Sequence, residues 1–368
     1  MFRTSRKRLR FAASVPLALL YAISGAAASH AEQLPDATAG VQQISPAVVP
    51  VSGGGAGVNS GPVSSDQSPG SRGADSGLSA ESSAPSWCGS STWMGFRDEV
   101  CVRSDTFLNW YDQNGKQTGR ADLRVTQHLQ LNPKGRTFAE NFDLEVTRVT
   151  GTLPGASLNL NVSCGGTCVA TSHFPNGSAI VAGSTVSAAI SYEDSTSAVN
   201  KTYSAYSLSW GPQTKTPIDW TSPYYRCDNV FAGYSPGCVF PDIFPVLTSM
   251  SSLPNISANI RNIQQSGPSH YGRMADGLPI SRNSSLEAAN RRISCPPDRP
   301  RPAGMSCDEY PFATTDQGAS KTSQPDWGWA WVPVEEQNSQ GGLLSSFYRS
   351  SRVMDGTNGN GDKFWVQV

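Results

Sequence analysis

The sequence predicts a multidomain protein in which an N-terminal antiparallel β-sandwich-like domain is followed by a small α+β domain. Between residues 86 and 250, apolar and polar residues alternate over short stretches, which is the period of half-buried strands. After residue 251 the apolar spacing is partly helical and partly strand-like. A long segment rich in Ser, Gly and Pro precedes both regions and has scarcely any large apolar side chain.

Residues 1–31 have the features of a secretory signal peptide. Five basic side chains precede an apolar stretch from Phe11 to about Ile23, and small residues follow, as in cleaved signals. A small-x-small pattern at residues 29–31 places cleavage before Glu32, with residues 26–28 as a competing site. The apolar run is shorter than the roughly 20 residues of a membrane-spanning helix. We therefore expect a secreted, extracellular protein without stable membrane association.

Residues 32–85 are predicted to be a disordered linker, because their small side chains bury too little apolar surface to offset backbone entropy. Cleavage of the signal peptide would remove five of the 28 basic residues and leave 23 against 29 acidic residues. The mature chain is therefore mildly acidic. Any contact with nucleic acid would need a local basic patch rather than an overall positive charge.

Eight cysteines follow the signal peptide and form four pairs that are close in sequence. An even number of cysteines in an exported protein indicates disulfides. The favoured bonds join Cys88 to Cys101, Cys164 to Cys168, Cys227 to Cys238, and Cys295 to Cys307. Many other connectivities stay open. Zinc binding at Cys164 and Cys168 is the alternative, although no second pair or histidine follows at ligand spacing.

The region 86–250 is predicted to be a β-rich domain of unknown role, stabilised by the early disulfides. Its alternating stretches cover residues 123–125, 129–131, 144–146, 158–162 and 186–190. The region 251–368 is predicted to be the α+β domain. Its expected helices cover residues 256–265, a stretch from an N-cap at Ser284 or Ser285 to about residue 293, and residues 343–353 after Gly341-Gly342, and its expected strands cover 329–332 and 364–366.

Asp308 and Glu309 form an acidic pair directly before Tyr310-Pro311-Phe312. On an extended segment neighbouring side chains point to opposite faces, so that one of the two carboxylates is drawn to a partner or to the interior. This carboxylate is a candidate ligand for a hard divalent cation such as Mg²⁺, Mn²⁺ or Ca²⁺. A turn followed by a strand is the alternative interpretation.

Arginines are enriched between residues 261 and 301, where seven of them accompany three acidic residues. The guanidinium group matches phosphate oxygens in bidentate geometry, and phosphodiester cleavage requires a basic groove beside a metal ion. A salt-bridged helix surface would produce the same run of residues.

Several short motifs follow one another over about the last 110 residues. The central motif is Cys307-Asp308-Glu309-Tyr310-Pro311-Phe312-Ala313. The others are Ser269-His270, Asn290-Arg291, Gln317-Gly318, Val332-Pro333, Asn338-Ser339-Gln340-Gly341 and Gly361-Asp362-Lys363-Phe364-Trp365-Val366. In this order they resemble the NucA/NucB family of secreted bacterial deoxyribonucleases, although no single motif is specific.

The resemblance implies a non-specific DNA endonuclease with a metal-dependent active site that contains Asp308 and Glu309. We expect one of these carboxylates to hold the cation, and the other, or His270, to activate water. Asn338 would orient the water or complete the metal shell. The flanking phosphates of the DNA would bind Arg282, Arg291 and Arg292.

Ser281 departs from the short family members, which are acidic at this position. If that carboxylate is needed, Asp276 or Glu287 would have to replace it. Three functions therefore stay open. The chain is a monomeric secreted DNase, a nuclease toxin that is paired with an immunity or inhibitor protein, or an inactive nuclease-like protein that binds surfaces.

Overall fold

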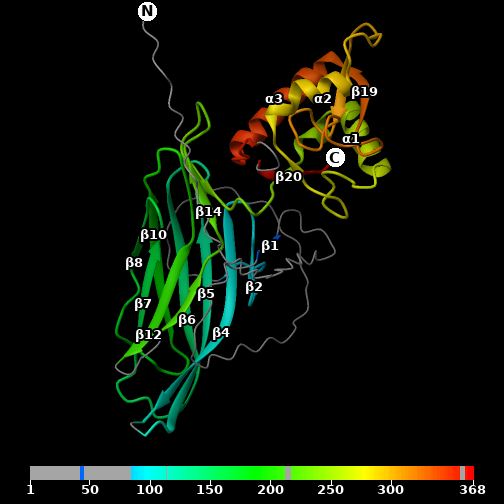
Figure 1. The fold of residues 1–368 in the computed structure, drawn as a ribbon. Coiled ribbons are helices and arrows are strands. Elements are labelled where there is room, and N and C mark those ends of the chain that lie inside the picture. Colours follow the sequence, from blue (N-terminus) through cyan, green and yellow to red (C-terminus); the bar gives the residue numbers. More distant parts are fainter. Residues whose placement is uncertain (1–41, 45–83, 113, 212–216, 357–360) are drawn as a thin grey trace, which may run out of the picture. The chain divides into compact units, whose positions relative to one another are not determined.

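The computed structural model describes residues 42–44, 84–112, 114–211, 217–356 and 361–368 (Figure 1). The predicted signal peptide lies outside these residues, as does most of the predicted linker. All described residues belong to one compact unit, Pro35–Val368. None of the helices in the described ranges is long and apolar enough to cross a membrane.

Strands dominate the region that the alternating pattern marks as β-rich. The largest sheet has eight strands in the order β1-β3-β4-β5-β6-β10-β8, with β2 paired to β4. All its pairs are antiparallel except β2 with β4. Its strands are β1 (Gln42–Ile44), β2 (Gly89–Ser90), β3 (Trp93–Gly95), β4 (Glu99–Tyr111), β5 (Gln117–Gln130), β6 (Thr137–Gly151), β8 (Cys168–Ser172) and β10 (Thr185–Asp194). Strand β1 lies where the sequence predicts a flexible linker.

Two smaller antiparallel sheets complete this region, in the orders β13-β12-β7-β9 and β11-β14-β15. Their strands are β7 (Ser157–Cys164), β9 (Ser178–Ala179), β11 (Val199–Thr202), β12 (Ser204–Gly211), β13 (Ile218–Thr221), β14 (Tyr225–Asp228) and β15 (Gly237–Val239). Apolar side chains of the largest sheet, such as Leu123 and Leu144, share one core with Leu160 of β7 and Leu208 of β12. The stretches predicted over 123–125 and 129–131 are one strand, because the alternation of burial runs through β5 without interruption.

The four favoured disulfides are all confirmed. They join Cys88 to Cys101, Cys164 to Cys168, Cys227 to Cys238, and Cys295 to Cys307. The zinc alternative is wrong, because Cys164 and Cys168 are bonded to each other at the adjoining ends of β7 and β8. Four disulfides are typical of an extracellular protein.

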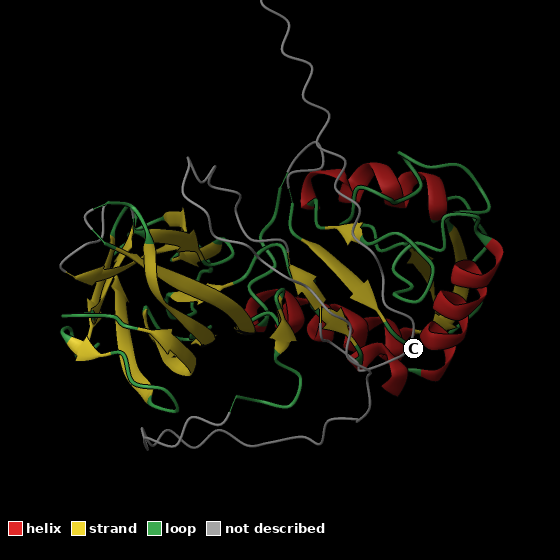
Figure 2. Ribbon diagram, turned by 90° about the horizontal axis from the view of Figure 1, so that it is seen from below, coloured by secondary structure: helices red, strands yellow, loops and turns green. Residues whose placement is uncertain are grey.

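Helices are confined to the C-terminal region of the described chain (Figure 2). Its elements are β16 (Val246–Leu247), η1 (Ser249–Ser252), α1 (Pro254–Ser266), β17 (Ile280–Ser281), η2 (Ser284–Leu286), α2 (Glu287–Ser294), β18 (Met305–Tyr310), β19 (Gly328–Pro333), α3 (Val334–Ser350) and β20 (Lys363–Val366). Strand β20 pairs with β16 and β17, and β18 pairs with β19. This region has an apolar core of its own, whose residues run from Leu247 to Val366.

Helix α1 and strands β19 and β20 agree with the prediction, whereas two helix starts differ. The side chain of Asn283, not of Ser284 or Ser285, accepts the capping hydrogen bond, from the backbone N–H of Ser285 at 3.2 Å. Helix α3 begins nine residues earlier than predicted and includes both glycines. Its first turn holds two acidic residues, Glu335 and Glu336, which favour a helix N-terminus and oppose the cost of about 1 kcal/mol per helical glycine.

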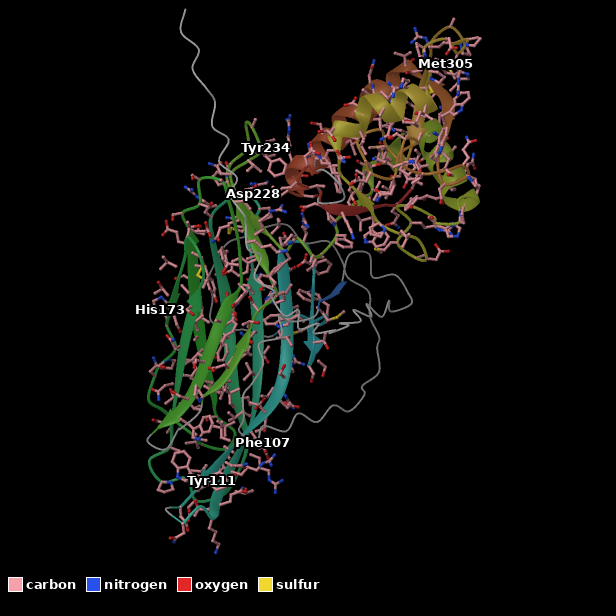
Figure 3. All side chains as sticks on the ribbon, viewed as in Figure 1. Phe107, Tyr111, His173, Asp228, Tyr234 and Met305 are labelled. Atoms are coloured by element: carbon pink, nitrogen blue, oxygen red, sulfur yellow. A yellow bond between two sulfur atoms is a disulfide. The ribbon has the colours of Figure 1, made fainter. Side chains whose placement is uncertain are left out.

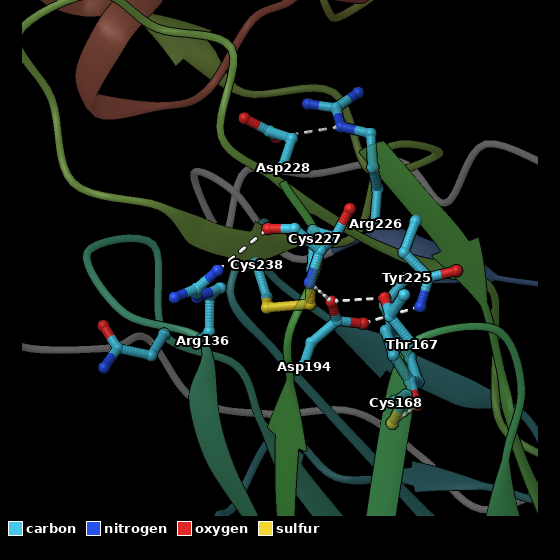
Figure 4. The surroundings of a disulfide bond; sticks show 12 residues. Arg136, Thr167, Cys168, Asp194, Tyr225, Arg226, Cys227, Asp228 and Cys238 are labelled. Atoms are coloured by element: carbon cyan, nitrogen blue, oxygen red, sulfur yellow. Dashed lines mark hydrogen bonds and ion pairs between the residues drawn. A yellow bond between two sulfur atoms is a disulfide. The ribbon is translucent and has the colours of Figure 1, made fainter. Parts of the chain in front are cut away.

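Five charged residues, four of them buried and Asp362 partly buried, connect β14 and the segment between β3 and β4 to the C-terminal end of the chain. Asp228, at the end of β14 (Figures 3 and 4), accepts hydrogen bonds from Arg226 at 3.1 Å and from Arg352 Nε at 3.2 Å. Asp362 accepts from Arg226 at 2.8 Å and pairs with Arg97 at 2.5 Å. Burial lowers the pKa of Arg97 to about 10 although Asp362 opposes the shift, so that this guanidinium is still charged at neutral pH. We call these five residues the arginine cluster.

Candidate active site

The predicted acidic pair lies on β18, the strand that begins at Met305 (Figure 3). Asp308 is opposite Ala330 of β19, and Glu309 is opposite Trp329. Because side chains alternate along a strand, the two carboxylates leave β18 on opposite faces. They therefore have different surroundings.

Asp308 is completely buried between α1 and α3. Its Oδ2 accepts a hydrogen bond from Asn259 Nδ2 at 2.8 Å, and its Oδ1 accepts one from Gln340 Nε2 at 2.7 Å. Burial raises the pKa of Asp308 to about 6, while the two amide hydrogen bonds oppose this rise and Glu336 adds to it. Both carboxylate oxygens are thus already bound to side chains of the protein.

Glu309 lines a cavity of about 1310 Å³. Its Oε1 is 3.3 Å from Nε of Arg291, which also pairs with Glu287 at 3.3 Å. Burial raises the pKa of Glu309 to about 7, although Arg291 opposes the rise and Asp308 adds to it. Glu309 is therefore a carboxylate that can take up and release a proton near neutral pH.

Positive charge predominates along the walls of the same cavity. Strand β18 contributes Glu309 and Cys307, α2 contributes Glu287 and Arg291, and α3 contributes a stripe of side chains that includes Asn338. The arginines that line the cavity are Arg282, Arg291, Arg299, Arg301 and Arg349. Cys307 is bonded to Cys295, so that β18 is covalently tied to the end of α2. The cavity thus combines one carboxylate of raised pKa with five cations.

The structure brings together only part of the predicted site. Glu309, Asn338, Arg282 and Arg291 line the cavity, whereas Asp308, His270 and Arg292 are not among its lining residues. His270 follows the end of α1 with a left-handed φ of 44°, and its Nδ1 is 2.6 Å from the carbonyl oxygen of Gln264. Asp308 and Glu309, both expected in the active site, leave β18 on opposite faces, and of the two only Glu309 lines the cavity.

Ser281, the position at which short family members are acidic, also lies outside the lining of the cavity. It is buried in β17, and its backbone N–H donates to Oε1 of Gln317 at 2.8 Å. Of its two possible substitutes, Asp276 pairs with Arg273, and Glu287 lines the cavity. The serine therefore removes no carboxylate from the cavity wall.

Four amide side chains around the site were not predicted. Asn259 and Gln264 are buried on the apolar face of α1, where Asn259 binds Asp308 and Gln264 Nε2 donates to Tyr310 at 3.1 Å. Gln337 and Gln340 lie on α3 and line the cavity. Asn259 and Gln264 could have been found in the sequence, because they are polar residues beside the apolar stripe of a predicted helix. A buried amide at such a position needs a hydrogen-bond partner.

Residues 262–366 match the family Deoxyribonuclease NucA/NucB. This confirms the resemblance, and it covers the C-terminal domain from within α1 to the last residue of β20. Glu309 and the five cavity arginines all lie inside the NucA/NucB region. Among curated proteins, none matches the chain.

The predicted cation site does not fit the Asp308-Glu309 pair, since both oxygens of Asp308 are occupied by amide donors. In the described part of the chain, no three His, Cys, Asp or Glu side chains form a group that could hold a metal ion. Of these two residues, only Glu309 lines the cavity. Mg²⁺ keeps several of its waters in protein sites, so that a cation beside Glu309 would be held largely by water and by amide oxygens of the cavity wall.

The stability of the folded chain is expected to fall as the pH rises from about 4.5 to 7. Burial raises the pKa of both Asp308 and Glu309, so that the folded state binds more protons than the unfolded state in this range, and stability decreases with pH. At about 1.4 kcal/mol per pKa unit, the contribution of Glu309 is on the order of 3 kcal/mol. Urea unfolding of the full chain at about pH 4.5 and at about pH 7 measures this change in the free energy of unfolding. The Glu309→Gln variant should depend less on pH, and an equally steep dependence would contradict the assignment.

Proposed function

We propose that the chain is a secreted DNA endonuclease whose NucA/NucB region hydrolyses phosphodiester bonds as a monomer. The observation that carries this proposal is Glu309, a carboxylate with a pKa of about 7, in a cavity lined by five arginines. The family match supports DNA as the substrate. We also infer that the two larger β-sheets stack as a sandwich, which their shared core supports.

In the proposed reaction, a water molecule attacks the phosphorus atom and Glu309 takes up its proton. A general base works best when its pKa is close to the working pH. The guanidinium groups bind the non-bridging oxygens and stabilise the negative charge that develops there. A divalent cation bound through water and the amide oxygen of Asn338, beside Glu309 but not on it, would polarise the phosphate.

A plasmid assay on the secreted full chain tests the proposal. We expect supercoiled DNA to be nicked and then degraded, EDTA to stop the reaction, and Mg²⁺, Mn²⁺ or Ca²⁺ to restore it. DNA that stays intact with each of the three cations would contradict the proposed endonuclease activity. Cleavage that continues in EDTA would contradict only the proposed requirement for a divalent cation.

Replacing Arg301 is expected to weaken DNA binding, whereas replacing Arg292 is not. Both side chains are exposed, but only Arg301 lines the cavity. Because each phosphate contact adds about one unit to the salt dependence of binding, Arg301→Gln should raise KM several-fold and reduce the slope of log KM against log salt by about one. Arg292→Gln is the matched control. Equal effects of the two substitutions would show that the cavity is not where the phosphates bind.

A further inference from the structure

Two tryptophans lie on the same face of the β18–β19 pair as Glu309. In the antiparallel register, Trp329 is directly opposite Glu309, and Trp331 is directly opposite Cys307. Directly opposite residues of two paired strands project from the same face of the sheet, and so do residues two positions apart on one strand. Glu309 and Cys307 both line the cavity. The cavity face of β18 and β19 therefore carries both indole rings beside the carboxylate.

The two rings have different surroundings. Trp329 is covered by Arg299, whose guanidinium carbon is 3.5 Å from the ring centroid. Trp331 is partly exposed and lines the cavity. Within the described chain its one ring contact is with Trp329, at 5.4 Å between centroids and an interplanar angle of 78°. Because these two rings are nearly perpendicular, Trp331 is an aromatic surface of the cavity wall on which no other ring is stacked.

Trp331 shares the cavity with the five arginines described above. Guanidinium groups bind phosphate oxygens, and an aromatic side chain stacks on the face of a base whatever its sequence. A positively charged groove with aromatic side chains is the usual arrangement for binding single-stranded nucleic acid. In a duplex both faces of a base are covered by neighbouring bases, so that the base has to leave the stack before a protein ring can reach it. Trp331 can therefore stack only on an unpaired base.

The depth of the carboxylate favours the same class of substrate. Glu309 is only 8% exposed, so that a phosphate has to enter the cavity to reach it. Duplex DNA is stiff over about 150 base pairs, and bending it costs energy. A single strand turns at each nucleotide and enters a cavity without this cost.

We propose that the cavity takes single-stranded or locally unpaired DNA, and that Trp331 is the binding residue that stacks on a base beside the scissile phosphate. This inference rests on the proposed endonuclease function and names its substrate class. The arginines bind the phosphates of the same strand, so that the base and the backbone are held together. Negative supercoiling favours the opening of base pairs, and a supercoiled plasmid therefore offers such sites.

Binding of the full chain to three probes separates the contribution of the bases from that of the phosphates. The probes are a mixed-sequence single strand of about 16 nucleotides, the duplex that it forms with its complement, and an abasic strand with as many phosphates as the single strand. In EDTA, where we expect no cleavage, the single strand should bind about tenfold more tightly than either of the others, as for one stacked base. A single strand that binds no better than the abasic strand, or no better than the duplex, would overturn the inference.

Substitutions of Trp331 identify the side chain that stacks. Trp331→Leu keeps an apolar side chain without a ring, and Trp331→Phe keeps a ring. We expect Trp331→Leu to bind the single strand about tenfold more weakly and the abasic strand as before, and Trp331→Phe to keep most of the preference. Tyr111→Leu is the matched control, because Tyr111 is 46% exposed at the end of β4 and does not line the cavity. A folded Trp331→Leu variant that keeps the tenfold preference would overturn the role of Trp331.

The inference and the proposed endonuclease fail on different measurements, since binding in EDTA requires no cleavage. A chain that cleaves plasmid DNA but binds the three probes alike would keep the endonuclease and overturn the single-strand preference. A chain that prefers the single strand through Trp331 but cleaves no DNA would support the binding site and contradict the endonuclease. In a chain that does both, Trp331→Leu should raise KM for single-stranded DNA about tenfold and leave kcat nearly unchanged.

Discussion

Glu309→Gln is expected to lower kcat for DNA cleavage by about 10²–10⁴-fold, the usual contribution of a general base. Glutamine has nearly the same shape and can still contact Arg291, but it cannot take up a proton. In the original chain, kcat should rise with pH until it levels off above about pH 7, because burial raises the pKa of Glu309 to that value. The variant should lose this part of the pH profile. Initial rates on plasmid DNA between pH 5 and 9 measure both effects.

Glu287→Gln is the matched control for this substitution. Glu287 lines the same cavity and pairs with the same arginine at 3.3 Å, but it lies on α2 and takes up no proton in the proposed reaction. We expect kcat to change by less than about tenfold, which corresponds to less than about 1.4 kcal/mol of the barrier. A Glu309→Gln variant that is folded and cleaves DNA as fast as Glu287→Gln would show that Glu309 is not the base.

Asp228→Ala is expected to destabilise the chain by about 3–5 kcal/mol, the usual cost of removing one partner from a buried ion pair. Asp228 is completely buried and binds both Arg226 and Arg352. Without it, the arginine cluster would hold three guanidinium groups and only Asp362. Arg352 is in the NucA/NucB region, and Arg226 is in β14 of the β-rich region. Removing Asp228 should therefore destabilise both regions. Urea unfolding of the full chain, with tryptophan fluorescence as the signal, measures the change.

Asp105→Ala provides a comparison at the surface. Asp105 pairs with Arg124 at 2.9 Å, and its side chain is 65% exposed. Pairs of this kind contribute about 0–1 kcal/mol, because water screens them. A similar urea midpoint for Asp228→Ala and Asp105→Ala would mean that the arginine cluster does not stabilise the fold. An unchanged midpoint at high salt for the original chain is expected, since buried pairs are screened little.

The sequence predicted secondary structure best where one periodic signal was uninterrupted. The spacing of Ile256, Ile260 and Ile263 located α1 to within two residues at each end. Helix α3 was missed over its first nine residues, because Gly341 and Gly342 were taken as a boundary. Glycine weakens a helix by a local amount, and contacts elsewhere can outweigh it. Here Gln340 is anchored to Asp308, and Tyr348 is buried in the second core.

For the site, the sequence predicted the segment but not the role of each residue. Glu309, Asn338, Arg282 and Arg291 were predicted and line the cavity, whereas His270 and Arg292 were predicted and do not. Nothing in the spacing between His270 and Glu309 fixes the distance between them in space. The amides of Asn259 and Gln340 were missed, because their contacts join helices α1 and α3 to β18 across long stretches of sequence. Gln337 was missed as well, although its contact is with Gln340 on the same helix.

The sequence by itself predicted that strands precede a mixed domain, favoured the cysteine pairing that the structure has, and showed that the last part of the chain is similar to a nuclease family. These features depend on local periodicity, short loops and motifs, all of which are written in neighbouring residues. The tertiary structure alone decided that Asp308 and Glu309 have different surroundings, one bound by two amides and the other facing five arginines. The physical reason is that burial and partners set the chemistry of a carboxylate, and both depend on which helices pack against each face of β18.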